Sequence, residues 1–157
     1  MTDWHEGLRL LHLLAAAVLL GLRLGGGWYL ARALRGADPA VITNVARGGV
    51  IAELVLTTPA VLIQLLTGLA LADGLGLTLT TPWLAVALGV FIAVGLLWLP
   101  LVWIEYRIAY LAGASAAGAA PPQAMQRWAA WWHVIEWAML LGVLALFWLM
   151  VYRPALI

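Results

Sequence analysis

The sequence contains four apolar runs, each long enough to cross a bilayer as a helix, and no other feature constrains the fold as strongly. The runs cover approximately residues 8–30, 50–71, 83–103 and 128–151. A hydrocarbon core about 30 Å thick needs about 20 helical residues, and in lipid the backbone polar groups must be satisfied within the segment. A chain with 66% hydrophobic and 10% charged residues is also outside the range of soluble domains. We therefore predict an all-α polytopic membrane protein with one integral membrane domain, residues 1–157.

The connections between the runs predict an up-down-up-down bundle of four transmembrane helices. They cover residues 32–49, 72–81 and 112–122 and are rich in glycine, proline and small residues. The chain has no lysine, so orientation depends on arginine. Those flanking the first and third connections are Arg32, Arg35, Arg47, Arg107 and Arg127. The positive-inside rule then places both termini outside. The expected location of this multi-pass protein is a bacterial-type inner membrane.

Tryptophans mark the two predicted membrane interfaces. Trp28, Trp103, Trp128, Trp131 and Trp132 fall at the end of the bundle that carries the arginine-rich connections. At the other end are Trp4, Trp83 and Trp148. This placement indicates a protein surrounded by the lipid bilayer, and no basic patch suggests a nucleic-acid partner.

The antiparallel arrangement sorts the polar residues of the runs into two layers. The outer layer, toward the predicted outside, contains His12, Gln64 and Thr67. The inner layer contains Arg23, Glu53, Glu105, Arg107, His133 and Glu136. At about 100° per residue, the polar residues of each helix share roughly one face. Because a polar face in hydrocarbon must turn to a bundle interior or a watery cavity, we expect both layers inside the bundle.

Charges in the inner layer should be paired, since an isolated charge near the membrane centre costs at least about 2.5 kcal/mol. Matching depths predict that Arg23 pairs with Glu136 and that Glu53 pairs with His133. Glu105 is expected nearer the interface, where it can reach water. The layer has three interpretations: a structural ion-pair network, a metal site built from its carboxylates and its histidine, or a proton-handling site. For any reaction, the candidate residues are Arg23, Glu53, His133 and Glu136.

His12 has no carboxylate at its level in the bundle. Its partner is therefore a neutral polar group such as Gln64, or a ligand. Imidazole ligates haem iron, and helical bundles hold porphyrins between their helices. Met150 is a conceivable second axial ligand.

Several short motifs occur along nearly the whole chain: LLHLL at residues 10–14, TPA and TG at 58–60 and 67–68, PWL at 82–84, and MVYRP at 150–154. In order and spacing they resemble the HemJ-type protoporphyrinogen oxidases, and more closely a sister family of uncharacterised bacterial integral membrane proteins. The resemblance implies four membrane helices, b-type haem with His12 as an iron ligand, and oxidation of protoporphyrinogen IX. However, Ala85 and Ala87 replace a histidine and a lysine of that family, which argues against the oxidase activity itself.

Two functions follow as expectations. The first is a small membrane protein that binds b-type haem or a porphyrin and has a redox role, with His12 on the iron and Arg23 on the propionates. The second is a non-enzymatic subunit or accessory protein of a larger membrane complex, or a homo-oligomer, in which the polar cluster is structural. Glycines at 21, 25, 26 and 27 would permit close helix approach. A proton-coupled transporter is a weaker third, since we detect no inverted repeat.

Overall fold

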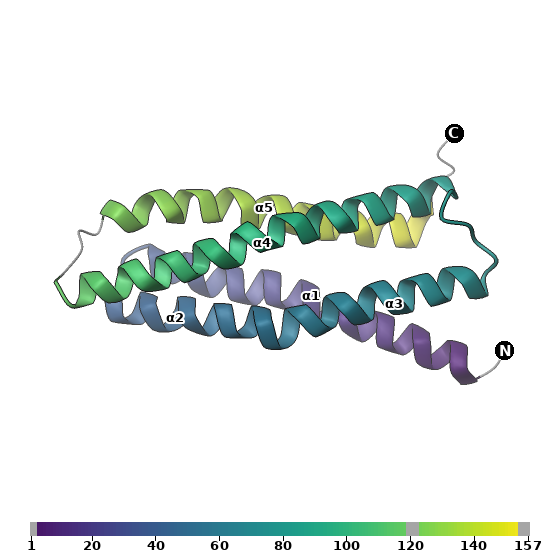
Figure 1. The fold of residues 1–157 in the computed structure, drawn as a ribbon, viewed down its shortest axis with the longest axis horizontal. Coiled ribbons are helices and arrows are strands. Elements are labelled where there is room, and N and C mark those ends of the chain that lie inside the picture. Colours follow the sequence, from purple (N-terminus) through teal and green to yellow (C-terminus); the bar gives the residue numbers. More distant parts are fainter. Residues whose placement is uncertain (1–2, 119–122, 154–157) are drawn as a thin grey trace.

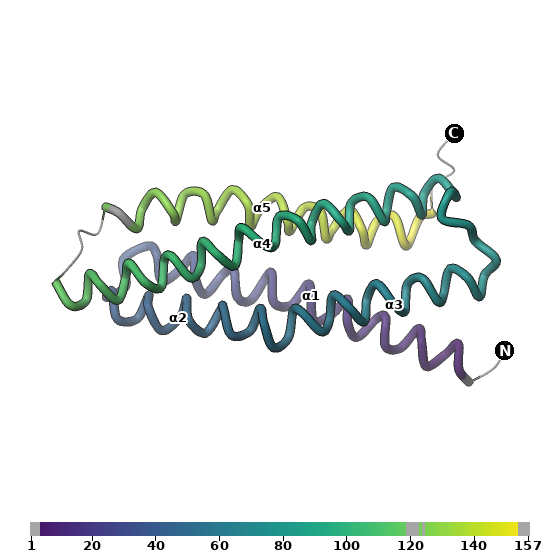
Figure 2. The backbone as a smooth tube through the Cα atoms, viewed as in Figure 1, coloured from purple at the N-terminus to yellow at the C-terminus, as the bar shows by residue number. Residues whose placement is uncertain are grey.

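The structure, a computed structural model, describes residues 3–118 and 123–153, and within these ranges it contains helices and no strand (Figure 1). The elements are α1 (Asp3–Leu34), α2 (Pro39–Ala52), the π-helical turn η1 (Glu53–Thr57), α3 (Thr58–Gly74), α4 (Pro82–Ala116) and α5 (Gln123–Tyr152). Figure 2 shows α2, η1 and α3 continuing as one rod. The described chain thus forms 4 rods long and apolar enough to span a membrane, which confirms the predicted all-α four-helix membrane bundle.

The rods alternate in direction. The start of α1, the end of α5 and the connection between α3 and α4 lie at one end of the bundle, and the α1–α2 turn lies at the other (Figure 1). Along the bundle, α4 packs on α5 and α2, while α1 packs on α2, α3 and α5. The predicted layers are therefore correctly matched in depth.

The first connection is shorter than predicted. Residues 32–49 were expected to link two helices, but the turn between α1 and α2 covers only residues 35–38. Gly36 adopts a φ of 142° there, and the Asp38 side chain accepts a hydrogen bond of 2.7 Å from the Ala40 N–H to cap α2. Gly48 and Gly49 lie within α2 and not in the turn, and Gly49 packs against the Glu105 side chain. In the third connection, the prolines at 121 and 122 lie outside the described residues.

The π-helical turn has a local cause in the sequence. Pro59 lacks an N–H, and its ring crowds the carbonyl four residues earlier, so a regular helix cannot pass through it unchanged. Thr58 closes the wider turn, because both its N–H and its hydroxyl bond the Glu53 carbonyl, the hydroxyl at 3.0 Å. Such single π-turns are rare and frequently occur at functional sites. This turn leaves both Glu53 and Thr57 facing the bundle interior.

The main hydrophobic core occupies the half of the bundle nearest the α1–α2 turn. Leu101 and Ile108 of α4 and Trp132 of α5 are its largest fully buried side chains. The prediction that Trp132 lies at a membrane interface is wrong: it is 1% exposed because its indole N–H bonds a buried carboxylate. Trp103 and Trp131, by contrast, are exposed on the outside of the bundle.

Gly142 offers a test of the α4–α5 packing. A Cβ added there would collide with the Val94 side chain of α4, whereas a Cβ at Gly89 of α4 would meet nothing. We expect Gly142→Leu to lower the free energy of unfolding in detergent by about 1–3 kcal/mol. Gly89→Leu is the control and should change it little. Equal losses in thermal unfolding would contradict the α4–α5 contact.

Candidate functional site

Arg23 lies between two carboxylates at the centre of the inner layer. Its Nη1 donates a 2.7 Å hydrogen bond to Oε2 of Glu136, and its Nη2 forms an ion pair with Oε1 of Glu53. All three residues are buried, Arg23 to 6% exposure. They come from α1, η1 and α5, so one guanidinium joins three elements. The predicted pair of Arg23 and Glu136 is formed.

The predicted pair of Glu53 and His133 is wrong. Oε1 of Glu53 takes Arg23, and its Oε2 accepts a 2.7 Å hydrogen bond from the indole N–H of Trp98. His133 instead packs edge-on against the Trp132 ring, with centroids 5.0 Å apart. A guanidinium presents several donors in one plane, so Arg23 can bond two carboxylates at once. Glu53 therefore does not need His133 as a partner.

The predicted position of Glu105 is wrong. It was expected near water, but it is 5% exposed, and its Oε1 accepts a 3.0 Å hydrogen bond from the Trp132 indole. Its Oε2 has no hydrogen-bond partner among the described residues. A Cβ at Gly49 of α2 would lie 3.1 Å from that oxygen. Because Gly49 has no side chain, α2 can pass close to the carboxylate and cover it.

Gly27 makes similar room on α1. A Cβ there would lie 2.5 Å from Oε1 of Glu136, an oxygen that has no partner among the described residues. The glycines of α1 and α2 thus face carboxylates of α5 and α4. The sequence shows glycines and carboxylates in the same membrane segments, which indicates that some glycines make room for an acid. Only the packing shows which glycine meets which acid.

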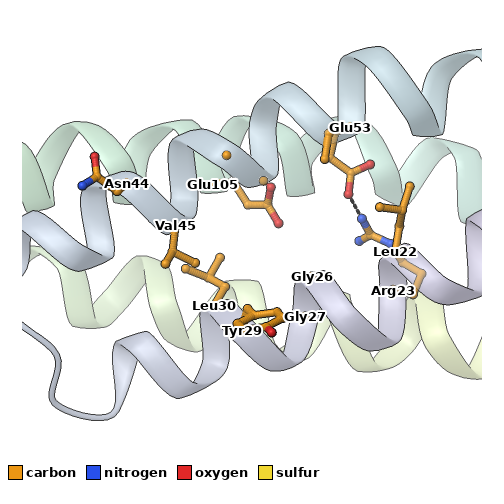
Figure 3. A pocket seen from close by; sticks show the side chains of 13 residues that line it. Leu22, Arg23, Gly26, Gly27, Tyr29, Leu30, Asn44, Val45, Glu53 and Glu105 are labelled. Atoms are coloured by element: carbon orange, nitrogen blue, oxygen red, sulfur yellow. Dashed lines mark ion pairs between the residues drawn. The ribbon is translucent and has the colours of Figure 1, made fainter.

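An inner cavity of about 290 Å³ lies between α1, α2 and these carboxylates (Figure 3). Arg23 and Glu53 form its deep end, and Asn44 and Val45 line it toward the α1–α2 turn. In Figure 3 the Glu105 carboxylate points into the space between them. The cavity is therefore lined by a carboxylate that has one unpartnered oxygen.

His12 has both ring nitrogens engaged in the outer layer. Nδ1 lies 2.9 Å from the Thr67 hydroxyl, and Nε2 lies 2.9 Å from the Gln64 amide nitrogen. Thr67 donates its own proton to the Ile63 carbonyl at 2.5 Å, so it accepts from Nδ1–H. Nε2 then carries the lone pair and accepts from Gln64. Gln64 is thus a partner of His12, as one of the two expectations had it. Thr67 is a second partner that the sequence did not predict.

An outer cavity of about 310 Å³ lies beside His12, between α1, α3, α4 and α5. His12 and Gln64 supply its polar wall, and the rest is apolar side chain, including Phe91, Phe147 and Met150. Ala87, one of the positions that departs from the HemJ-type pattern, also lines it. His12 and Met150, the two predicted iron ligands, therefore line the same cavity.

The inner layer does not support the metal interpretation. Within residues 3–118 and 123–153, no group of three or more histidine, aspartate or glutamate side chains is placed to hold a metal ion. The physical reason is that Arg23 occupies the space between the carboxylates and already neutralises part of their charge. Arg107 lies elsewhere, with its guanidinium 5.9 Å and 5.6 Å from the ring centroids of Trp103 and Trp128.

Comparison with known proteins gives one family. The sequence model of a family described as "Predicted integral membrane protein (DUF2269)" matches residues 6–154. No curated protein and no solved structure matches the chain. The match agrees with the membrane assignment, and the resemblance to HemJ-type oxidases stays a prediction.

The pairing of the buried charges predicts how much each substitution among Arg23, Glu53 and Glu136 destabilises the protein. Arg23→Leu strands two buried carboxylates and should cost about 3–5 kcal/mol, whereas Glu136→Gln leaves Arg23 paired with Glu53 and should cost less. Neutralising both acids with Glu53→Gln and Glu136→Gln should recover most of the loss caused by Arg23→Leu. Thermal unfolding in detergent measures each variant, with Arg47→Leu as an exposed control. Strictly additive losses across the set would contradict the shared guanidinium.

Proposed function

The chain belongs to the DUF2269 family of predicted integral membrane proteins, and from that premise we propose that it binds b-type haem or a related porphyrin in the outer cavity, in a redox role. The observation that carries the proposal is a mostly apolar cavity with a single imidazole in its wall. Ligand sites are mostly apolar clefts with a few placed polar groups, and volumes start at about 300 Å³. The cavity is partly open at its side, so a ligand larger than its volume can extend beyond it.

The setting of His12 suits a metal ligand. Ligating histidines donate their second ring N–H to a neighbouring oxygen, which fixes the tautomer and the ring orientation. Thr67 accepts that proton here, and Gly68 gives the ring room, since a Cβ there would lie 3.1 Å from Cε1. The remaining nitrogen, Nε2, faces Gln64, so binding iron means replacing one hydrogen bond from a neutral amide. The other amide atom, Oε1 of Gln64, is buried without a partner.

Two further side chains, Met150 and Arg23, are candidates for contact with the proposed haem. Met150 lines the same cavity and is the candidate for a second ligand, and bound haem iron would supply reversible one-electron transfer. A contact of Arg23 with a propionate stays a prediction. To make this contact, Arg23 would have to release Glu53 or Glu136. Oxidation of protoporphyrinogen is no part of the proposal, since alanines occupy positions 85 and 87.

The alternative, a non-enzymatic subunit or homo-oligomer with a structural polar cluster, rests on α1. Gly21 and Gly25 are four residues apart, exposed, and have open space where a Cβ would be. Small residues at this spacing allow two membrane helices to approach closely. In this case the buried charges would only hold the bundle together.

Absorption spectroscopy of the protein purified in detergent tests the haem proposal. We expect a Soret band in the wild type that is lost or shifted in His12→Ala, because the proposed iron ligand is removed. Gln64→Leu should retain the band, since it frees Nε2. His133→Ala is the matched control, a membrane histidine in the other layer, and should not change the spectrum. A colourless wild type after haem supplementation, or an unchanged band in His12→Ala, would rule the proposal out.

Disulfide trapping tests the alternative. The chain has no cysteine, so Gly21→Cys introduces a single reporter on the α1 face, and Leu96→Cys on the exposed side of α4 is the control. If α1 mediates association, oxidation of native membranes should give dimers from the first variant and not from the second. Monomers from both would count against this surface.

A further inference from the structure

The inner layer carries more negative than positive charge. Arg23 faces three buried carboxylates, those of Glu53, Glu105 and Glu136, and it contacts only the first and the last. Glu105 lies near both Arg23 and Glu136 without an ion pair of its own. Uncompensated negative charge at this depth is costly, so the third carboxylate favours the binding of a positive charge.

We propose that Glu105 is a proton-binding carboxyl inside the membrane, supplied with protons through the inner cavity. Its Oε2 is buried, has no hydrogen-bond partner among the described residues, and belongs to a side chain that points into that cavity (Figure 3). The reaction is reversible protonation of one carboxylate oxygen, with no other bond made or broken. None of the residues that carry this inference lines the outer cavity, so it is independent of the ligand proposed there.

The surroundings of Glu105 favour a proton over a metal ion. Hard cations such as calcium need about six to eight oxygen ligands. In the cavity, both oxygens of Glu53 and one oxygen of Glu105 already bond Arg23, Trp98 and Trp132. Among the residues that line this cavity, one carboxylate oxygen has no partner in the described part of the chain, which is enough for a proton and too little for a coordination shell.

The groups facing Glu105 fix where the proton binds. From α1 the titratable groups that line the cavity are Arg23 and Tyr29, and from η1 it is Glu53. From α5, Glu136 bonds Arg23, and His133 packs against the Trp132 ring. The residues of α2 that line the cavity are not titratable. Since Arg23 stabilises the ionised forms of its two direct partners, Glu105 is the acid that takes the proton.

The cavity also defines the side of access. It extends from Arg23 toward the α1–α2 turn, lined on the way by Gly49, Val45 and Asn44. At its deep end, the guanidinium and its two carboxylates link α1, η1 and α5. The charged side chains at that end are joined by ion pairs, and the cavity ends at them. Protons therefore reach Glu105 from the arginine-flanked end of the protein.

The test combines infrared spectroscopy with carbodiimide labelling of the full-length protein in detergent or liposomes. A protonated carboxylic acid gives a C=O stretch that shifts in D₂O, and dicyclohexylcarbodiimide, which is lipid-soluble, modifies protonated and not ionised carboxyls. We expect a wild-type band that declines as pH rises, and carbodiimide label on Glu105 mapped by mass spectrometry. Glu105→Gln keeps the size of the side chain and should lose both.

Glu136→Gln is the matched control, an acid in the same layer that should leave the band and the label in place. Labelling on Glu53 or Glu136 instead of Glu105, or a band that survives Glu105→Gln, would overturn the proposal. Protection from label by sodium chloride at constant pH, with choline chloride as reference, would overturn it in favour of a metal-cation site. If Glu105→Asp retains a pH-dependent band while Glu105→Gln does not, the proposal is supported independently of the labelling.

Discussion

The inner half of the bundle depends on one buried guanidinium. Arg23 bonds Glu53 and Glu136, and these acids come from the second and fourth membrane rods, so the register of three rods is fixed at one point. In hydrocarbon there is little hydrophobic driving force between helices, and polar contacts and close packing hold them together. A buried charge triad of this kind is costly to leave incomplete, which makes the arrangement specific as well as stable.

Two backbone features allow that triad to form. The π-turn before Pro59 changes the angular position of Glu53 relative to the polar stripe of α3, and the N–H and the hydroxyl of Thr58 both bond the Glu53 carbonyl. Gly27 and Gly49 then let α1 and α2 approach the acids of α5 and α4. The helices therefore approach closely where the charges are, and the inner cavity lies beside them.

The triad also separates two chemically different spaces. On one side, the outer cavity is apolar and presents an imidazole whose tautomer is fixed by Thr67. On the other, the inner cavity presents a carboxylate with a free oxygen. The electron-carrying ligand proposed for the first and the proton-binding acid proposed for the second are the two kinds of group that proton-linked redox chemistry needs. Because their residues do not overlap, each can be altered without touching the other.

The sequence by itself determined the class of fold, the number of spans and which polar residues share a layer, because bilayer thickness and helical rise leave little freedom. It also identified the pair of Arg23 and Glu136, and it named Gln64 as one of two kinds of partner for His12. It failed for Glu105, Trp132 and the partner of Glu53. The position of a residue along its helix follows from the sequence. The direction in which its side chain meets a neighbour depends on the π-turn, on glycines in other helices and on which donor lies within hydrogen-bond distance. Only the tertiary structure decides those, so only it placed beside a cavity a Glu105 oxygen that has no partner among the described residues.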